Sequence, residues 1–400
     1  MQAKISPKYL TLLTAGLAYL SNVFTVNLPY VLKEKPLLEF GFKQSELINA
    51  NANLLAFQHL GILIGAIIFG MMADKKGRLF LLFTSVLIYS IGTLAGGLAH
   101  NYYLFVFFRF IVGLGLAAEL GIGLVLISEI FPQKQRSMAI LFIAIMGYIG
   151  MFLVGILASH FYWRNLYLYG GIGSFLIMLL RFGSFESDIF LAVKKIDKNT
   201  RSIFSLLKEK RFLFLILSIL PTYLITAGSI FAGNYFLKNS NLDRKAGTII
   251  LYFSFGAILG FIAFVFLSKY FKSRKKTITI CIIGLMILSF IFAFYEINGP
   301  VKLQLLFTLL GFFAAYLFEL LAMTLEQFGT NYRALATTLL FGIGRSSVFV
   351  FSLIIPIFDK AFFNNYLYTL FVLNLIVFSV GIWAINQIKE EYNRDLQFVE

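Results

Sequence analysis

Residues 109–136, RFIVGLGLAAELGIGLVLISEIFPQKQR, are the stretch from which the fold of this chain follows. The run is long, apolar and punctuated by glycine, yet it carries Arg109, Glu119, Glu129 and Arg136. An ionisable side chain at bilayer depth costs roughly 2.5–3.5 kcal/mol, so it normally faces a partner or a water-filled cavity. The stretch therefore predicts a membrane-spanning helix whose charged side chains have a function.

The composition of the whole chain is that of a polytopic membrane protein. Of the 400 residues, 59% are hydrophobic and only 13% are charged, and the mean hydropathy is +0.85. These values lie far outside the range of a soluble domain. The apolar runs are continuous, which excludes the alternating pattern of a membrane β-barrel. A single cysteine, Cys281, excludes an intrachain disulfide and a cysteine metal site.

Hydropathy predicts an all-α membrane protein of twelve transmembrane helices in two six-helix bundles. A polar stretch divides the spans six and six. The predicted domains are an N-terminal bundle at 1–181, a cytoplasmic linker at 182–211, and a C-terminal bundle with a short cytoplasmic tail at 212–400. The predicted spans are residues 9–32, 47–72, 79–99, 103–129, 137–160, 165–181, 212–237, 245–268, 277–295, 303–325, 334–358 and 366–387.

Lysine and arginine are distributed unevenly among the loops. Of the 34 basic residues, 23 fall in the termini, the linker and the alternate loops on their side, and 9 fall in the opposite set. Basic residues concentrate on the cytoplasmic side of membrane proteins. The net charge of +15 therefore reflects orientation and not a nucleic-acid-binding face, and it predicts cytoplasmic termini.

A short motif recurs at the same place in the two halves. The segment EIFPQKQR at 129–136 reappears as EQFGTNYR at 326–333, with an offset of 197 residues. Each copy closes the fourth span of its half. This recurrence predicts that the chain consists of two duplicated halves, as in many secondary transporters.

The loop after the second span carries a motif of a known family. Gly70-x-x-x-Asp74-x-x-Gly77-Arg78 resembles the signature loop of the major facilitator superfamily. The resemblance implies that Asp74 and Arg78 belong to a gate at the cytoplasmic side. Ion pairs suit a gate because they break at modest cost where water is present. The predicted gating residues are Asp74, Arg78, Glu129, Arg136, Glu326 and Arg333.

Within that superfamily, the opening stretch is most similar to metabolite:proton symporters of the organic-acid and betaine type. The similarity lies in the spacing of Arg109, Glu119, Glu129, Pro132 and Arg136. The final E-x-x-P-x-x-x-R is also similar to sugar porters. We expect a multi-pass protein of the cell inner membrane that functions as a monomer and requires no cofactor or metal.

Arg109 and Glu119 are the first candidates for a substrate and proton site. Ten residues apart on a helix, they are separated by about 15 Å of rise and cannot pair directly. In this hypothesis Glu119 takes up the proton that is coupled to transport. Arg109 either adjusts the proton affinity of Glu119 or orients an anionic substrate. The alternative is that Arg109 only joins helices through backbone carbonyls.

Other polar groups within the spans are secondary candidates. His59 is either a proton relay or a hydrogen-bond donor between helices. Glu319 does not align with Glu119 at the offset of 197, which places Tyr316 there, so the halves are expected to differ chemically. The remaining candidates in this group are Arg345, Asn22, Asn27 and Tyr223.

These features together predict a secondary transporter. An enzyme is not expected, since the sequence contains no phosphate-binding loop, no metal-ligand spacing and no nucleophile with an adjacent base. We expect proton-coupled import, by alternating access, of a small carboxylate-bearing metabolite: an organic acid, an amino acid or a carboxylate siderophore. The expected partners are this substrate, protons and the lipid bilayer. Two alternatives are a proton-coupled exporter of drugs or other apolar compounds and a non-transporting membrane receptor.

Overall fold

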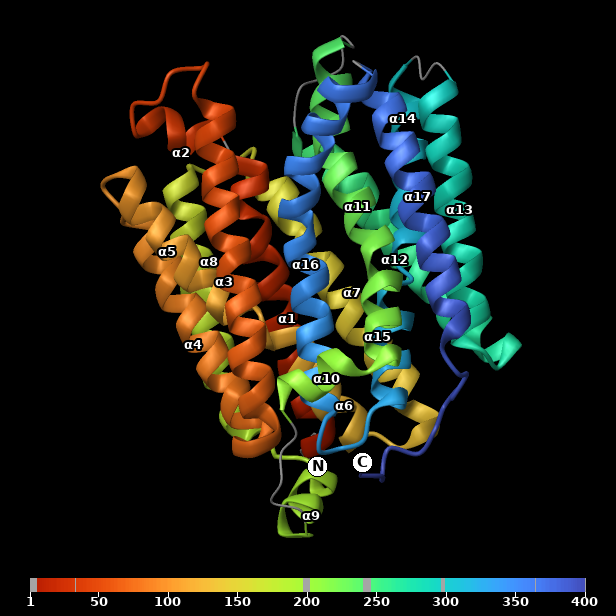
Figure 1. Ribbon diagram of the computed structural model, residues 1–400. Coiled ribbons are helices and arrows are strands. Elements are labelled where there is room, and N and C mark those ends of the chain that lie inside the picture. The colour runs from red at the N-terminus through yellow and green to blue at the C-terminus, as the bar shows by residue number, and fades with distance from the viewer. Residues whose placement is uncertain are drawn as a thin grey trace. The chain divides into compact units, whose positions relative to one another are not determined.

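The structure is a computed structural model that describes residues 6–32, 34–196, 202–239, 246–295, 299–363 and 365–399 (Figure 1). Within these residues the chain forms helices and no strand. Twelve of the described helical segments are long and apolar enough to cross a membrane. The predicted all-α fold with twelve transmembrane helices is confirmed.

The first half contains six spans, of which the fourth consists of two helices. Spans begin and end close to the predicted boundaries, and a short helix, α2, lies between the first two. The helices are α1 (Pro7–Leu32), α2 (Glu34–Glu39), α3 (Leu47–Lys76), α4 (Arg78–Gly97), α5 (Tyr102–Leu116), α6 (Ala118–Ile130), α7 (Gln133–Leu157) and α8 (Trp163–Leu180).

The second half repeats this order after a linker that contains the short turn η1 (Arg181–Gly183), α9 (Asp188–Ile196) and α10 (Ile203–Lys208). Residues 197–201 of the linker lie outside the described residues, and the division at 182–211 stays a prediction. The helices are α11 (Lys210–Asn239), α12 (Ala246–Phe271), α13 (Arg274–Phe294), α14 (Pro300–Ala314), α15 (Leu317–Gln327), α16 (Arg333–Phe358), η2 (Asp359–Phe363) and α17 (Tyr366–Gln387).

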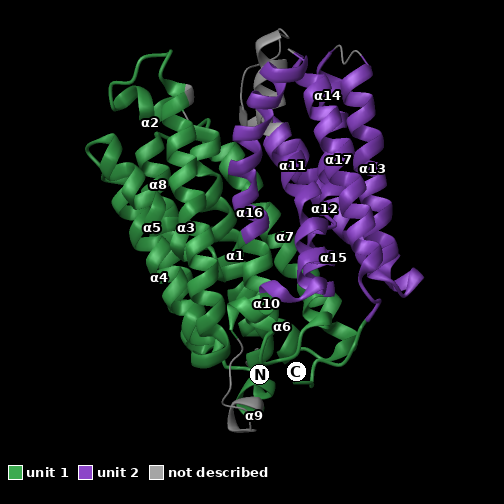
Figure 2. Cartoon of the chain, viewed as in Figure 1, with its two compact units in different colours: residues 1–206, 324–342, 393–400 green, residues 207–323, 343–392 purple. Residues whose placement is uncertain are grey.

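The chain divides into two compact units, which we describe separately (Figure 2). Unit 1 contains residues 1–206, 324–342 and 393–400, and unit 2 contains residues 207–323 and 343–392. Unit 1 thus includes the second copy of the duplicated motif and the C-terminal segment. Parts of both halves of the sequence therefore meet inside one unit.

Glycine allows α3 and α5 to approach within backbone contact in unit 1. A Cβ atom added to Gly113 would collide with the carbonyl oxygen of Gln58, and one added to Gly61 would collide with that of Phe110. Small residues permit such close packing of membrane helices. This contact brings Gln58 of α3 beside the α5 turn that contains Arg109.

The regular helix of the fourth span is interrupted near its middle in each half, although Ala117 and Ala315 keep helical φ and ψ angles. We call each interruption a break. α5 ends at Leu116 and α6 begins at Ala118, while α14 ends at Ala314 and α15 begins at Leu317. Breaks in membrane helices expose backbone groups that must find partners, and they commonly mark transport sites. Both breaks lie beside the buried carboxylates predicted from the sequence.

Candidate functional site

Arg109 is a fully buried cation whose described hydrogen-bond partners are all uncharged. Its Nε donates to Oε1 of Gln58 over 2.9 Å, and its Nη2 donates to the carbonyl oxygen of Thr25 over 3.1 Å. The guanidinium also lies 5.4 Å from the ring centroid of Tyr167. Nη1 is buried without a hydrogen-bond partner, and no carboxylate among the described residues lies within ion-pair distance. The site therefore holds an uncompensated positive charge.

Polar side chains of α1 and α3 lie in the same unit as Arg109. Asn22 donates to the carbonyl oxygen of Leu116 over 2.9 Å, which satisfies the backbone at the break between α5 and α6. The hydroxyl of Tyr30 is hydrogen-bonded to Nε2 of His59. Asn27 instead bonds to its own helix at the Val23 carbonyl oxygen, over 2.8 Å. Of these candidates, Asn22 thus contacts the broken span directly.

Glu119 is held by an arginine that the sequence did not single out. It lies in the first turn of α6 with 2% of its surface exposed, and Arg181 is 1% exposed. Arg181 Nη1 donates to Oε2 over 3.2 Å, and Nη2 donates to Oε1. The two candidates of the opening stretch therefore have separate partners, in agreement with the expectation that they do not pair with each other.

Unit 2 contains a matching buried ion pair. Glu319 lies in the first turn of α15, and its Oε2 accepts from Arg274 Nη1 over 2.7 Å and from Ser268 Oγ over 2.8 Å. The arginines come from non-equivalent spans, because Arg181 follows the sixth span and Arg274 begins the ninth, so the expected chemical difference between the halves stays a prediction. Glu319 stands seven residues before Glu326, whereas Glu119 stands ten before Glu129. A shift of three residues moves a side chain by one turn on roughly the same helix face, so a fixed offset misses the match.

Tyr316, at the break of the tenth span, reaches the backbone of α11. Its hydroxyl accepts from the Thr222 amide over 3.2 Å and donates to the Ser218 carbonyl oxygen over 2.9 Å. A regular α-helix pairs these two backbone groups with each other. Pro221 stands between them, and proline weakens the helix locally. The tyrosine thus supports α11 where it is weakest.

Arg345 and Tyr223 are both buried in unit 2, on α16 and α11. The ring of Tyr223 packs against Gly344, the residue before Arg345. This places the two candidates on contacting helices. Their participation in a substrate site stays a prediction.

Four of the predicted gating residues form one buried cluster in unit 1, which we call the ion-pair cluster: Asp74, Arg78, Glu129 and Arg333. Arg78 Nη2 lies 3.4 Å from Asp74 Oδ1 and 3.3 Å from Glu129 Oε1, and it donates to the Thr330 carbonyl oxygen over 2.9 Å. Arg333 Nη1 lies 2.9 Å from the same oxygen of Glu129. The cluster therefore joins segments from both halves of the sequence.

The ion-pair cluster is incompletely satisfied. Nε and Nη1 of Arg78 and Oε2 of Glu129 are buried without a hydrogen-bond partner. Asp74 Oδ2 accepts the Leu335 amide over 3.2 Å, in the first turn of α16, where a free amide and the helix dipole favour an anion. Unsatisfied buried polar groups are costly, which makes this cluster suitable for opening.

The two copies of the duplicated motif fold alike. Arg136 Nε donates to the Ser128 carbonyl oxygen over 3.1 Å, and Arg333 Nε donates to the Leu325 carbonyl oxygen over 3.0 Å. In both cases the acceptor stands eight residues earlier, in the last turn of α6 or α15, where carbonyls lack helical partners. Each arginine therefore caps the helix that precedes it, and this shared geometry supports duplication.

Residues of the linker contact the ion-pair cluster and the start of α4 within unit 1. The ring centroid of Phe190, on α9, lies 4.1 Å from the guanidinium of Arg78. Glu186 accepts the amide of Leu79 over 3.0 Å beside Gly77, whose φ of +108° favours glycine. The ion-pair cluster is thus covered by the polypeptide that follows the sixth span.

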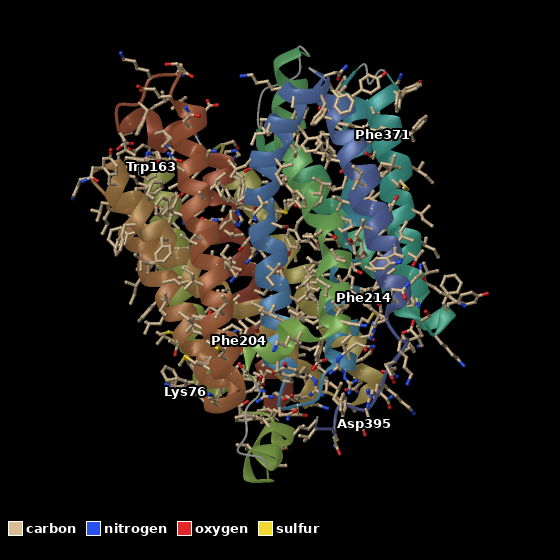
Figure 3. All side chains as sticks on the ribbon, viewed as in Figure 1. Lys76, Trp163, Phe204, Phe214, Phe371 and Asp395 are labelled. Atoms are coloured by element: carbon tan, nitrogen blue, oxygen red, sulfur yellow. The ribbon has the colours of Figure 1, made fainter. Side chains whose placement is uncertain are left out.

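Glu39, at the end of α2, joins this short helix to the start of α8. These residues lie at the end of unit 1 where Figure 3 shows Trp163, opposite Lys76 and Asp395. Its carboxylate accepts hydrogen bonds from Tyr162, Trp163 and, over 2.9 Å, Arg164. Burial raises the pKa of Glu39, but these hydrogen bonds outweigh it and hold the pKa below its usual value.

The residues that the sequence analysis missed are those whose partners are distant in the chain. Arg181 and Arg274 stand at the ends of apolar spans, where a basic residue is ordinarily explained by membrane orientation. Gln58 was visible as a polar residue inside a span, next to His59. Among the described residues, no group of three or more His, Cys, Asp and Glu side chains is arranged to hold a metal.

Comparisons with known proteins agree with the fold. A family model of the Major Facilitator Superfamily matches residues 10–352. The sialic acid transporter NanX of Escherichia coli strain K12 is 29% identical over 253 residues, which cover 56% of this chain and 62% of that protein. The 4-hydroxybenzoate transporter PcaK of Acinetobacter baylyi is 35% identical over 154 residues, which cover 37% of this chain and 33% of that protein. The chain thus matches less than two thirds of the length of these relatives.

A solved structure resembles the whole chain. The proton:xylose symporter XylE, bound to 6-bromo-6-deoxy-D-glucose, superposes with a TM-score of 0.80 over 98% of both chains, at 16% identity. At this identity the likeness shows the fold alone.

Proposed function

The chain belongs to the Major Facilitator Superfamily of membrane transporters, and on this basis we propose that it imports a small carboxylate-bearing metabolite together with protons. It is a multi-pass membrane protein. We propose that both termini lie in the cytoplasm because of the distribution of basic residues. We further propose that the protein functions as a monomer in the cell inner membrane, by similarity to bacterial transporters of the family. During the transport cycle a central site would be accessible from each side of the membrane in turn.

The observation that carries this proposal is the uncompensated charge of Arg109. The side chain is fully buried and its described partners, Gln58 and the Thr25 carbonyl, are neutral. A buried charge is stable only when it is paired or solvated. An arginine with a free Nη1 can take a carboxylate through strong charge-assisted hydrogen bonds. A substrate anion would therefore supply the missing counter-ion.

The names of the relatives point in the same direction. Sialic acid and 4-hydroxybenzoate, which NanX and PcaK carry by name, both bear a carboxylate. Neither match covers the whole chain, so these names support a class of substrate and no particular compound. Organic acids, amino acids and carboxylate siderophores remain within this class.

Glu119 is the first candidate for proton coupling, and Glu319 is the second. Each is buried, each lies just after a helix break, and each forms an ion pair with an arginine. A proton on Glu119 would remove its charge and release Arg181. Because Arg109 and Glu119 stand on opposite sides of the break at Ala117, a change in backbone geometry there would link substrate binding to protonation.

Alternating access requires that the ion-pair cluster come apart in one state. Its members come from both halves of the sequence, and several of their polar atoms lack partners. We therefore assign Asp74, Arg78, Glu129 and Arg333 to the inner gate. Arg136 would support this gate through its hydrogen bond to the Ser128 carbonyl oxygen, and Glu326 through the hydrogen bond that it accepts from the Asn393 amide.

Uptake of radiolabelled solutes into proteoliposomes tests the proposal. An imposed inward proton gradient should drive accumulation of a carboxylate but not of its neutral amide. Glu119→Gln should abolish accumulation against the gradient, and Arg109→Gln should raise the apparent KM at least about tenfold, the loss expected for one charged hydrogen bond. Lys389→Gln, on the exposed tail, is the matched control.

Three outcomes would contradict the proposal. Expulsion of an apolar dye without uptake of any carboxylate would indicate an exporter. No flux of any compound, with properly inserted protein, would indicate a receptor. Carboxylate uptake that ignores the pH gradient would remove the proton from the mechanism.

A further inference from the structure

The C-terminal segment 393–398, which we call the strap, lies against the duplicated motif in unit 1. It follows the last helix, α17, and it is not itself helical. Leu396 is fully buried, while Val399 just beyond it is 47% exposed. The strap is therefore anchored by packing as well as by its backbone.

Backbone groups of the strap contact the first copy of the motif. The carbonyl oxygen of Arg394 accepts from Arg136 Nη1 over 3.0 Å. The carbonyl oxygen of Asn393 accepts from the side-chain amide of Gln133. Both donors belong to the start of α7. A charged donor makes the first of these bonds stronger than an ordinary one.

The same segment contacts the second copy. The carbonyl oxygen of Leu396 accepts from Arg333 Nη2 over 2.8 Å and from Thr330 Oγ1 over 3.2 Å. The carbonyl oxygen of Phe398 accepts the Thr330 amide over 2.8 Å. In addition, the Asn393 amide donates to Glu326 Oε1 over 3.0 Å.

Arginine also stacks on the end of the strap. The ring centroid of Phe398 lies 5.7 Å from the guanidinium of Arg333 and 3.9 Å from that of Arg394. Cation–π contacts of this kind add to the hydrogen bonds. Arg333 therefore donates from Nη1 to Glu129 in the ion-pair cluster and from Nη2 to the strap, while its Nε caps α15.

We propose that the strap is part of the gate: it positions Arg136 and Arg333 and joins the two copies of the motif until the gate opens. These arginines come from different halves of the sequence, and the strap binds both at once. If the halves separate during alternating access, the strap must leave at least one of them. This inference rests on the proposed transport cycle and on no particular substrate or coupling ion.

The direct test measures exposure of the gate in the absence of substrate. Cys281 is the only cysteine and is buried, so a thiol introduced by Ser128→Cys can be followed alone. Ser128 is 1% exposed and precedes Glu129. Its reaction rate with a water-soluble maleimide, in purified protein in nanodiscs, reports opening of the gate.

Deletion of residues 393–400 should raise this rate at least about tenfold, since the strap's charged and neutral hydrogen bonds are lost and water replaces them only in part. Leu396→Ala should raise it less, and Val399→Ala, at an exposed position one residue beyond the strap, should leave it unchanged. A synthetic peptide of residues 393–400 should lower the rate in the deletion variant.

Two results would overturn the inference. One is a monodisperse deletion variant whose labelling rate equals that of the full chain. If the deletion variant aggregates, equal rates for Leu396→Ala and Val399→Ala in monodisperse protein decide against the strap. Neither readout needs substrate or a pH gradient, so failure here is distinct from failure of carboxylate transport.

Discussion

Replacement of Glu119 by glutamine tests the buried ion pair of unit 1. Both partners are almost fully buried, and Arg181 donates to both carboxylate oxygens. Removal of one partner from a buried pair costs about 3–5 kcal/mol, because the other charge is left uncompensated. With an unfolding entropy of roughly 2.1 cal/mol/K per residue, 400 residues convert this cost into a fall in Tm of about 4–6 °C.

The two single replacements should not be equivalent. Glu119→Gln leaves an arginine, which cannot release its proton. Arg181→Gln leaves a carboxylate, which can take up a proton and become neutral. Arg181→Gln should therefore cost less, and its cost should shrink as the pH falls. The double variant should recover most of the loss, since a neutral pair can replace a buried ion pair at little cost.

Thermal unfolding in detergent, with the parent and all three variants at two pH values, provides the assay. Lys389→Gln is the control, because its pair with Glu391 is exposed and should contribute about 0–1 kcal/mol. The ion pair does not have the role assigned to it if the Tm of Glu119→Gln lies within 1 °C of that of the control. The same holds if the fall in Tm of the double variant equals the sum of the falls of the two single variants.

Three further predictions concern other parts of the structure. Gly113→Val should disrupt the contact of α5 with α3 at Gln58 and abolish folding, measured by size-exclusion chromatography, whereas a folded variant would refute the contact. Tyr316→Phe should slow transport while leaving the apparent KM within about twofold, because it removes only the hydroxyl that supports α11; unchanged turnover would refute this. Glu39→Gln should lower the free energy of unfolding at neutral pH by less than about 1 kcal/mol, which is measured as a small fall in Tm. Because the pKa of Glu39 is depressed in the folded state, its contribution to stability is present above pH 4.5 and is lost as the pH falls through the folded pKa. A difference in Tm between parent and variant that grows in acid would contradict this assignment.

Hydropathy alone predicts the helices because each span must satisfy its backbone within itself. The last predicted span, residues 366–387, coincides with α17. The fourth was predicted as one helix at 103–129, and the structure divides it at Ala117. A single-residue break keeps the apolar pattern intact, so hydropathy cannot reveal it.

Tertiary partners are harder to predict than spans. Arg181 lies 62 residues from Glu119, and Leu396 lies 63 residues from Arg333. No local pattern connects such pairs, and the strap acts through backbone carbonyls that every residue possesses. The sequence identified Arg109, Glu119 and Glu319 as charges within the spans, whereas the structure identifies what they contact and adds the buried Arg181 and Arg274.

The carboxylate site at Arg109 is the central claim, and ligand-dependent thermal stabilisation tests it most directly. Each carboxylate in a metabolite panel is measured beside its own amide, with the parent protein and with Arg109→Gln. At 100 times its Kd a ligand should stabilise the folded parent by about 2.7 kcal/mol. We expect one or more carboxylates to stabilise the parent, their amides to have no effect, and Arg109→Gln to lose the response. Equal stabilisation by an amide, or an undiminished response in Arg109→Gln, would contradict the account.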